Sequence, residues 1–509
     1  MKQLFIALVL CVGGFGAAWG CSAGPKSSGF GSSGSPSGSG SSSGGGSSGD
    51  NGTGSSSGGS LSANDASAPS EGDSGHGCTN LQCQVHSCTG GGSTTISGRV
   101  MDPAGRNPLY NVAIYIPNSQ GGQLAPIPIG VNTDSCSCDA LFSGEPMATT
   151  LTDANGNFKL TNAPDGANIP LVVQIGKWRK EIFIKNVTAC QDNPQGAITL
   201  PKTHAEGSIP SIAVSTGGAD SLECLLERVG VDPSEYTGDP NGTGRVHIFQ
   251  GAGGNNTQNP AGPSSPSSLW DSDTDLKRYD IVMFSCEGSP TSGATAQSSQ
   301  NLSDYVSAGG RVFAEHFHYA FFANQTPFAN TANWTTGGND NYQGQINGVV
   351  QTTLLNGQAF PEGQALQTWL GNVGALTSGQ LPITVARHDA IVQQGNLSTR
   401  WVESSGTSPE STQYFSWDMP FNAPTNDAGV PQYCGRVVFS DLHVSGSNGG
   451  IFGGGIDYTT SNVTPTGCAN QALSADEDAL EFILFDLSSC VTPIGFPPQP
   501  PPPNPMGPQ

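Results

Sequence analysis

Apolar residues follow two different patterns along the chain, and the change between them marks two folded parts. Within residues 94–203, short runs such as 110–116 (YNVAIYI) alternate apolar and polar positions, which is typical of half-buried strands. Within residues 208–491, short apolar strands alternate with helical patterns, such as the apolar positions at i, i+3, i+4 and i+7 from Leu222. We therefore predict an all-β sandwich followed by a doubly wound α/β domain with a parallel sheet.

The two ends of the chain follow neither pattern. A basic start and an apolar run over residues 4–12, too short to span a bilayer, predict a signal peptide over residues 1–20. Residues 21–77 are almost all small or polar, so they cannot bury enough apolar surface to become ordered, and we expect a flexible tether. Residues 492–509 are rich in proline, which favours an exposed polyproline II tail.

The end of the predicted signal peptide, GAAWG before Cys21, resembles a bacterial lipoprotein signal, in which the cysteine is acylated. The family prefers Leu where Ala18 stands and a small residue where Trp19 stands, so ordinary cleavage that leaves Cys21 as a thiol is the alternative. The resemblance implies a lipid anchor in the membrane, because acyl chains gain about 0.8 kcal/mol per buried methylene. We expect a cell-envelope protein, an outer-membrane lipoprotein that faces the periplasm or the cell surface.

Charge and cysteine content narrow the partners and the compartment. The formal charge of −22, from 18 basic and 40 acidic residues, disfavours a basic surface that binds the phosphates of a nucleic acid, so we expect no nucleic-acid partner. Thirteen cysteines suit an oxidising compartment. Without Cys11 and Cys21 the number is odd, which predicts one free thiol unless Cys21 is not lipidated.

Cysteines cluster in two places. In the Cys-rich segment 78–93, four residues separate each cysteine from the next, whereas zinc ribbons use two, so disulfides are favoured over a metal knuckle. Near the C-terminus we expect Cys434, Cys468 and Cys490 to form disulfides that hold the far wall of the candidate site described below.

The first folded part carries TTISGRVMDPAGRNPLYNVAIYIPN and then TTLTDANGNFKLTNAPDG. These stretches are similar to the carboxypeptidase regulatory-like domain, a transthyretin-type β-sandwich. The insertion 120–147, with Cys136 and Cys138, departs from the family pattern. The DANGN run from Asp153 alternates like a calcium loop, but Pro164 stands where an EF-hand has its bidentate acid, which favours a plain turn. The resemblance implies a spacer or adhesion role without catalysis.

The second folded part carries YDIVMFSCEG, LSDYVSAGGRVFAEHFHYAFF and CGRVVFSDLHVS. These stretches resemble the class I glutamine-amidotransferase-like fold, especially its trehalose-utilisation-type branch, which implies a flavodoxin-like sheet. In the amidotransferases a Gly-x-Cys-x-Gly elbow follows the strand that is 311–314 in this chain. His316 stands where the nucleophile would be, and a later family His maps to His443. Since no activated thiol stands at the elbow, we expect that the chain is not a functional glutaminase.

Parallel sheets of this kind bind ligands beyond the C-terminal ends of their strands. The polar residues expected there are Glu315, His316, His318, Asp441 and His443. If the chain stays extended after the strand, the rings of His316 and His318 face one side, and we expect them to converge with His443 on one cleft. Three such rings can bind zinc and leave a position for water. A metal-free pocket and a vestigial cleft without a ligand are the alternatives, and no other cofactor is expected.

Two further pairs lie at predicted strand ends. Cys286 and Glu287 form a candidate displaced nucleophile with a neighbouring acid, which makes Glu287 a catalytic candidate beside His316 and His443. A carboxylate raises the pKa of a thiol, so a structural cysteine is favoured. The other pair, Arg387 and His388, has no supporting partner in the sequence and favours a structural role.

Two function classes follow. The first is a noncatalytic envelope module that presents or binds a surface polysaccharide or an envelope protein. The alternative is a hydrolase-like or carbohydrate-processing enzyme with a His-lined, metal-dependent site. The missing nucleophile and the regulatory-like sandwich favour the first class, so we expect no enzymatic activity.

Overall fold

The computed structural model describes residues 78–119, 124–132, 135, 136, 138, 141–254, 264–291, 293–336, 342–404, 406, 410–444 and 472–503. The predicted signal peptide, lipidation site Cys21, tether and Cys468 lie outside the described residues. The prediction of a multidomain, strand-rich chain is confirmed, with several sheets and few helices. No helix in the described part of the chain is long and apolar enough to cross a membrane.

The first folded part contains two sheets, in the orders β4-β1-β7 and β3-β2-β5-β6. The strands are β1 (Thr95–Met101), β2 (Ala113–Pro117), β3 (Pro146–Leu151), β4 (Asn157–Thr161), β5 (Gly166–Ile175), β6 (Trp178–Val187) and β7 (Asp192–Thr199), and a short 3-10 helix, η1 (Asn80–Gln84), precedes them. The period-two pattern is explicit in β4, where Phe158 and Leu160 are buried and their neighbours are exposed. Asp153 closes a local turn, since its Oδ1 accepts the backbone N–H groups of Asn155 and Asn157.

The second folded part is built on a ten-stranded sheet in the order β15-β14-β17-β18-β19-β12-β11-β8-β10-β9. Its strands are β8 (Ile212–Thr216), β9 (Tyr236–Thr237), β10 (Val246–Gln250), β11 (Ile281–Phe284), β12 (Arg311–Glu315), β14 (Tyr342–Val350), β15 (Leu381–Arg387), β17 (Thr399–Ser404), β18 (Thr412–Met419) and β19 (Gly435–Ser440). A separate small sheet pairs β13 (Asn333–Trp334) with β16 (Ala390–Ile391).

This sheet differs from the wholly parallel sheet that the sequence predicts. Neighbouring strands from β19 to β9 are parallel, whereas β18, β17, β14 and β15 extend the sheet with antiparallel pairs. The connection from β17 to β18, residues 405–411, is too short for a crossover helix, so these two strands can pair only as antiparallel neighbours.

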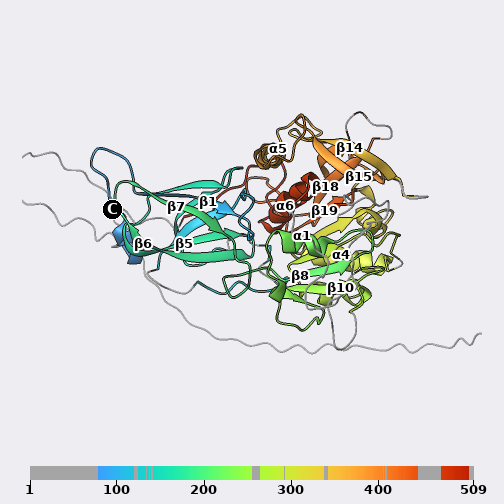
Figure 1. Ribbon diagram of the computed structural model, residues 1–509, viewed down its shortest axis with the longest axis horizontal. Helices are drawn as coiled ribbons and strands as arrows, with labels where there is room; N and C mark the ends of the chain where they lie inside the picture. Colours follow the sequence, from blue (N-terminus) through green and yellow to red (C-terminus); the bar gives the residue numbers. More distant parts are fainter. Residues whose placement is uncertain are drawn as a thin grey trace, which may run out of the picture. The chain divides into compact units, whose positions relative to one another are not determined.

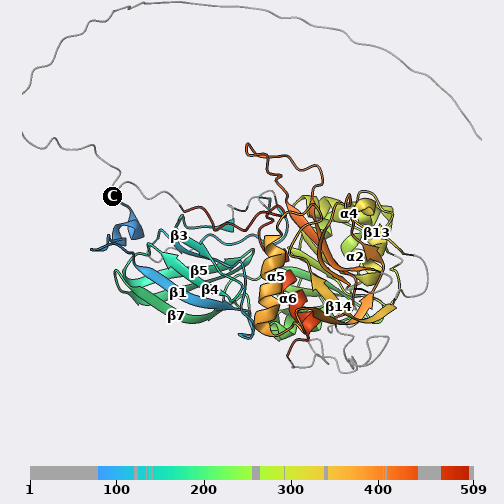
Figure 2. The ribbon, with the colours of Figure 1, turned by 90° about the horizontal axis from the view of Figure 1, so that it is seen from above.

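Helices cover both faces of the sheet. They are α1 (Leu222–Arg228), α2 (Ser267–Trp270), α3 (Asp273–Leu276), α4 (Ala296–Ser307), α5 (Pro361–Val373) and α6 (Ala475–Ser488), with 3-10 helices η3 (Pro233–Glu235), η4 (His316–Phe321) and η5 (Phe328–Asn330). Alternate strand residues point to opposite faces: Ile281 and Met283 join the apolar cluster that contains residues of α1, α5 and α6, and Val282 joins the cluster with α2 to α4. Figure 2 shows α5 and α6 side by side on the first of these faces.

The sandwich and the α/β part share one apolar core. All described residues belong to one compact unit, and the cluster around α5 and α6 continues into the sandwich (Figure 1). Tyr110 stacks on Phe482 with ring centroids 5.6 Å apart, and Trp369 Nε1 donates a hydrogen bond of 2.6 Å to the Pro108 carbonyl. Apolar side chains that are buried between the two folded parts therefore stabilise the contact.

Disulfides reinforce this contact. Cys136 bonds to Cys434 and Cys138 bonds to Cys490, so the insertion that departs from the sandwich family pattern is tied to the α/β part. The prediction of disulfides at Cys434 and Cys490 is confirmed, but their predicted place is wrong. Cys434 precedes β19, at the opposite end of that strand from His443, so the bridge does not hold a wall of the candidate site.

Near the N-terminus of the described chain, Cys78 bonds to Cys83 and Cys88 bonds to Cys190, as expected for a disulfide-rich segment rather than a metal knuckle.

Candidate metal centre at the strand ends

The candidate side chains follow three neighbouring strands of the large sheet and lie at one edge of it. β11, β12 and β19 are parallel neighbours, with Phe284 opposite Ala314 and Glu315 opposite Ser440. Because the carboxyl ends of parallel strands meet at one edge, the residues that follow these strands lie together. They include Cys286 after β11, His316 after β12 and His443 after β19.

The chain turns sharply at His316, where β12 ends and η4 begins. The backbone φ of His316 is 34°, a left-handed value that residues other than glycine rarely adopt. The extended backbone assumed in the sequence prediction is therefore absent, and His316 and His318 do not share a face. The buried ring of His318 stacks on Phe284 and Phe321, with centroids 5.2 and 6.0 Å away. Burial lowers the pKa of His318 to about 3, and the residue is not among the ligand atoms that converge.

His316 and His443 do meet. Nε2 of His443 lies 3.1 Å from Nδ1 of His316, and both residues are buried. The position of His443 is fixed by the antiparallel extension, because its backbone N–H donates to the Val385 carbonyl of β15 at 3.0 Å.

Cys286 completes the group. Its Sγ lies 3.4 Å from Nδ1 of His316, and the ligand atoms of Cys286, His316 and His443 all lie within 4.8 Å of one another. Cys286 is the free cysteine of the described residues, and its side chain is buried. Burial, with a smaller contribution from the negative charges of Glu315 and Asp220, raises the pKa of this thiol, so without an ion it is protonated and is no activated nucleophile.

A carboxylate stands behind His316. Its Nε2 lies 3.1 Å from Oδ2 of Asp389, which follows β15. Oδ2 of Asp441 accepts the backbone N–H groups of Asp389 and Ala390 at 2.8 and 3.2 Å, so Asp441 holds the Asp389 loop in place. A carboxylate that binds the far nitrogen of a histidine is the usual outer partner of a metal-bound imidazole.

The sequence prediction missed two of these roles. Asp389 follows the pair Arg387 and His388 directly, yet only that pair was considered, because nothing in the sequence shows that the β15 end approaches His316. For Cys286 the sequence predicts a structural cysteine, with a displaced nucleophile as the alternative, and not a metal ligand. The remaining catalytic candidate, Glu287, is not among the converging ligand atoms, and its carboxyl group hydrogen bonds to the Ala252 backbone and the Thr291 side chain.

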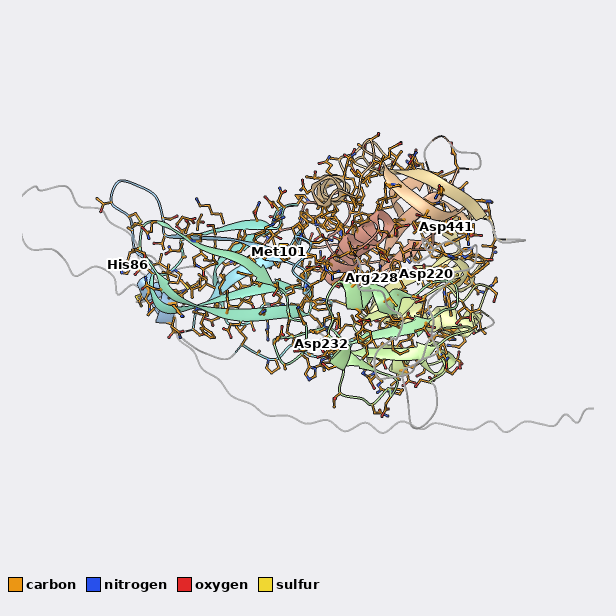
Figure 3. The ribbon with its side chains drawn as sticks, in the orientation of Figure 1. His86, Met101, Asp220, Arg228, Asp232 and Asp441 are labelled. Atoms are coloured by element: carbon orange, nitrogen blue, oxygen red, sulfur yellow. A yellow bond between two sulfur atoms is a disulfide. The ribbon has the colours of Figure 1, made fainter. Side chains whose placement is uncertain are left out.

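More buried acids surround the group. Burial raises the pKa of Glu315 well above its usual range, and the charge of Asp220 adds to this effect. Glu315 Oε2 accepts the Cys286 backbone N–H at 3.1 Å, and Asp220 Oδ2 accepts that of Val444 at 2.8 Å. Asp220 and Asp441, both labelled in Figure 3, thus act on the backbone around the ligands.

Two of the three separations between ligand atoms fit one tetrahedral ion. Metal distances of about 2.0–2.1 Å to nitrogen and about 2.3 Å to sulfur give tetrahedral edges of about 3.3 Å between two nitrogens and about 3.6 Å between nitrogen and sulfur. His316 Nδ1 lies 3.1 Å from His443 Nε2 and 3.4 Å from Cys286 Sγ, and each separation differs from the ideal edge by only a few tenths of an ångström. The ligand atoms of Cys286 and His443 lie within 4.8 Å of each other. Three protein ligands also leave a fourth position for water.

Comparison with known proteins does not assign this chain to a family. No family model and no curated protein matches this chain. Among solved structures, a 9R-lipoxygenase from Cyanothece is 13% identical over 23% of this chain and 18% of its own, with a TM-score of 0.13. A cytoplasmic protein from Salmonella typhimurium is 11% identical over 55% of this chain and 99% of its own, with a TM-score of 0.27. A ThuA-like protein from Bacteroides uniformis is 9% identical over 45% of this chain and 80% of its own, with a TM-score of 0.26. These likenesses are distant and carry no argument about function.

Proposed function

We propose that this chain is an exported envelope protein whose α/β part binds a divalent transition-metal ion through Cys286, His316 and His443. The observation that carries the proposal is the convergence of these three buried ligand atoms within 4.8 Å. One thiolate with two imidazoles favours zinc or a similar ion over magnesium or calcium, which prefer oxygen ligands. The Asp389 carboxylate behind His316 supplies the outer contact that such sites use.

The proposal includes the family assignments of the two folded parts. The sandwich of β1 to β7 is a carboxypeptidase regulatory-like, transthyretin-type domain with an accessory role. The α/β part is a flavodoxin-like member of the amidotransferase-like group, in its trehalose-utilisation-type branch. The parallel core from β19 to β10, with helices on both faces, supports this assignment. The buried, protonated Cys286 thiol supports the further proposal that the chain is not a glutaminase.

The cellular setting is part of the same proposal. We place the chain in the cell envelope, anchored in the membrane through a lipid on Cys21, with a surface polysaccharide or an envelope protein as its partner and no nucleic acid. The disulfides of the described chain support export, because such bonds persist in oxidising compartments.

A second candidate function is metal-dependent hydrolysis. It is favoured by one observation, the three-ligand set, since structural zinc sites use four protein ligands and catalytic sites use three with water in the fourth position. An ion in this position would lower the pKa of its bound water and supply a nucleophile, which the protonated Cys286 thiol does not.

The test is metal binding by the purified exported protein. Dialysis against Zn²⁺, followed by elemental analysis, should give one bound ion, and Co²⁺ in its place should give the absorption bands of tetrahedral thiolate coordination. Cys286→Ser and His443→Ala should lose the ion, whereas His204→Ala, at a partly exposed histidine, should keep it. Wild-type protein that binds no more Zn²⁺ than the Cys286→Ser variant, with both folded by circular dichroism, would exclude the metal centre. Ester and glycoside hydrolysis by the loaded protein, lost in Cys286→Ser, would establish the second candidate.

A further inference from the structure

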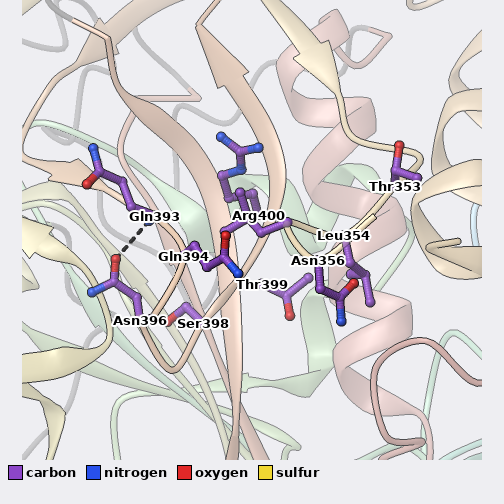
Figure 4. Close-up of a pocket in the computed structure, with 11 residues that line it drawn as sticks. Thr353, Leu354, Asn356, Gln393, Gln394, Asn396, Ser398, Thr399 and Arg400 are labelled. Atoms are coloured by element: carbon purple, nitrogen blue, oxygen red, sulfur yellow. Dashed lines mark hydrogen bonds between the residues drawn. The ribbon is translucent and has the colours of Figure 1, made fainter. Parts of the chain in front are cut away.

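A separate cavity of about 220 Å³, with a mixed polar and apolar lining, lies between the turn after β14 and the loop that leads into β17. Figure 4 shows residues of both segments around it. No residue of the proposed metal centre lines this cavity, so it needs a ligand chemistry of its own.

Four carboxamide side chains contribute to the lining. Asn356 comes from the turn, and Gln393, Gln394 and Asn396 come from the loop. Each carboxamide offers both a donor and an acceptor, and a sugar hydroxyl offers the same combination. The charged residue in the lining, Arg400, is paired with Glu403, so the cavity presents little net charge. This balance favours a neutral polyhydroxylated ligand over an anion.

Part of the lining is held in place before any ligand binds. The Gln393 backbone N–H donates to Oδ1 of Asn396 at 2.8 Å, the contact drawn in Figure 4. Oε1 of Gln393 accepts from Nδ2 of Asn333 at 2.9 Å. The Asn356 carboxamide is held as well, since its Nδ2 donates to Oε1 of Gln358 and its Oδ1 accepts the Gln358 backbone N–H. These bonds fix three of the four carboxamides and reduce the conformational entropy that is lost when a ligand binds.

Leu354 and Leu355 add an apolar side to the same cavity, suited to the C–H face of a sugar ring.

We propose that this cavity binds one neutral monosaccharide unit of an envelope polysaccharide. The volume of about 220 Å³ is below the roughly 300–1,000 Å³ of drug-sized sites, so the cavity itself holds about one ring. Leu355, Gln393, Gln394 and Arg400 also line an adjoining cavity of about 500 Å³, so the ligand can extend beyond that ring. This inference rests on the proposed envelope role, because it specifies the polysaccharide partner which that role includes. It does not depend on the metal centre.

The experiment is a saturation-transfer NMR titration of the purified protein with neutral oligosaccharides and with a matched uronic-acid oligosaccharide. Wild-type protein should bind a neutral series in preference to the acidic one. The Asn356→Ala/Gln394→Ala double variant should bind at least tenfold more weakly. Gln367→Ala, an exposed glutamine on α5, is the matched control and should bind like wild type.

The outcomes separate the two proposals. Cys286→Ser should keep saccharide binding, and the Asn356→Ala/Gln394→Ala variant should keep Zn²⁺ binding, which also shows that it is folded. No binding of any neutral saccharide, a preference for the acidic series, or equal affinity in wild type and double variant would each overturn the cavity proposal. If the protein binds no Zn²⁺ but still binds the neutral saccharide, only the metal proposal is overturned.

Discussion

At the scale of single residues, Asp389 is the group whose role the structure defines most sharply. It touches Nε2 of His316 from the side opposite Cys286 and His443, so it would orient a metal-bound ring without binding the ion itself. We expect Asp389→Asn to weaken Zn²⁺ affinity about 10–100-fold, because loss of such outer carboxylates has that effect in other metal sites. Competition with a chromogenic chelator measures the change. Asp304→Asn, on the exposed side of α4, should leave the affinity unaltered, and an unaltered affinity in Asp389→Asn would remove the carboxylate from the site.

The same residues show how far the sequence could predict the site. Strand order and the strand-end rule place His316 and His443 together, and the structure brings them to 3.1 Å. His318 could not be placed, because a two-residue spacing puts rings on one face only in extended backbone, and the φ of 34° at His316 ends the strand. The role of Asp389 could not be predicted. Asp389 follows β15, which belongs to the antiparallel part of the sheet, and a parallel-sheet pattern does not include that part.

At the scale of elements, a disulfide that closes a long loop should stabilise the protein more than one that closes a short loop. With Cys136–Cys434 intact, the bridge Cys138–Cys490 closes a loop that runs through residues 434–490 and is far longer than the loop of Cys78–Cys83, whose sequence separation is 5. Chain entropy predicts that replacing both cysteines of the longer loop by serine costs roughly 4 kcal/mol, against roughly 2 kcal/mol for the short loop. Thermal unfolding without reductant compares the variants. Equal losses would show that native-state contacts, and not loop closure, set the contribution.

Elements also differ in how well the sequence predicts them. The helix α6 follows from its capping box, in which Ser474 and Glu477 bond to each other's backbone, and from its apolar positions. The sequence predicts a strand before Arg387, which is β15, but it does not predict β14, β17 and β18 or their antiparallel order. That order depends on tertiary pairing that starts at β19 and not on a local period.

At the scale of the whole molecule, the contact between the sandwich and α6 contains a group of buried acids. Asn107 of the sandwich donates from Nδ2 to Asp478 at 3.0 Å and to Glu481 at 2.6 Å. Burial raises the pKa of Asp102 to about 6 and that of Asp478 to about 7, and it raises the pKa of Glu481 well above its usual range. The nearby pair of Arg228 with Glu477 is already matched in charge and does not neutralise these acids.

This group should make the protein more stable in mild acid than in mild base. The folded state holds protons that the unfolded chain releases near pH 4, so the contribution of these acids is complete below about pH 4 and is lost as the pH rises through about 6 to 7. We expect the free energy of unfolding to fall between pH 5 and pH 8 by an amount on the order of 2 kcal/mol, measured by urea unfolding. The formal charge of −22 acts in the same direction, so the control must separate the two causes. Asp102→Asn/Asp478→Asn/Glu481→Gln removes the titrating acids but changes the net charge little, and it should reduce the dependence. An equal fall in wild type and variant would exclude these three acids as its cause and assign it to general charge repulsion or to other buried acids with raised pKa values, such as Glu223 and Glu362.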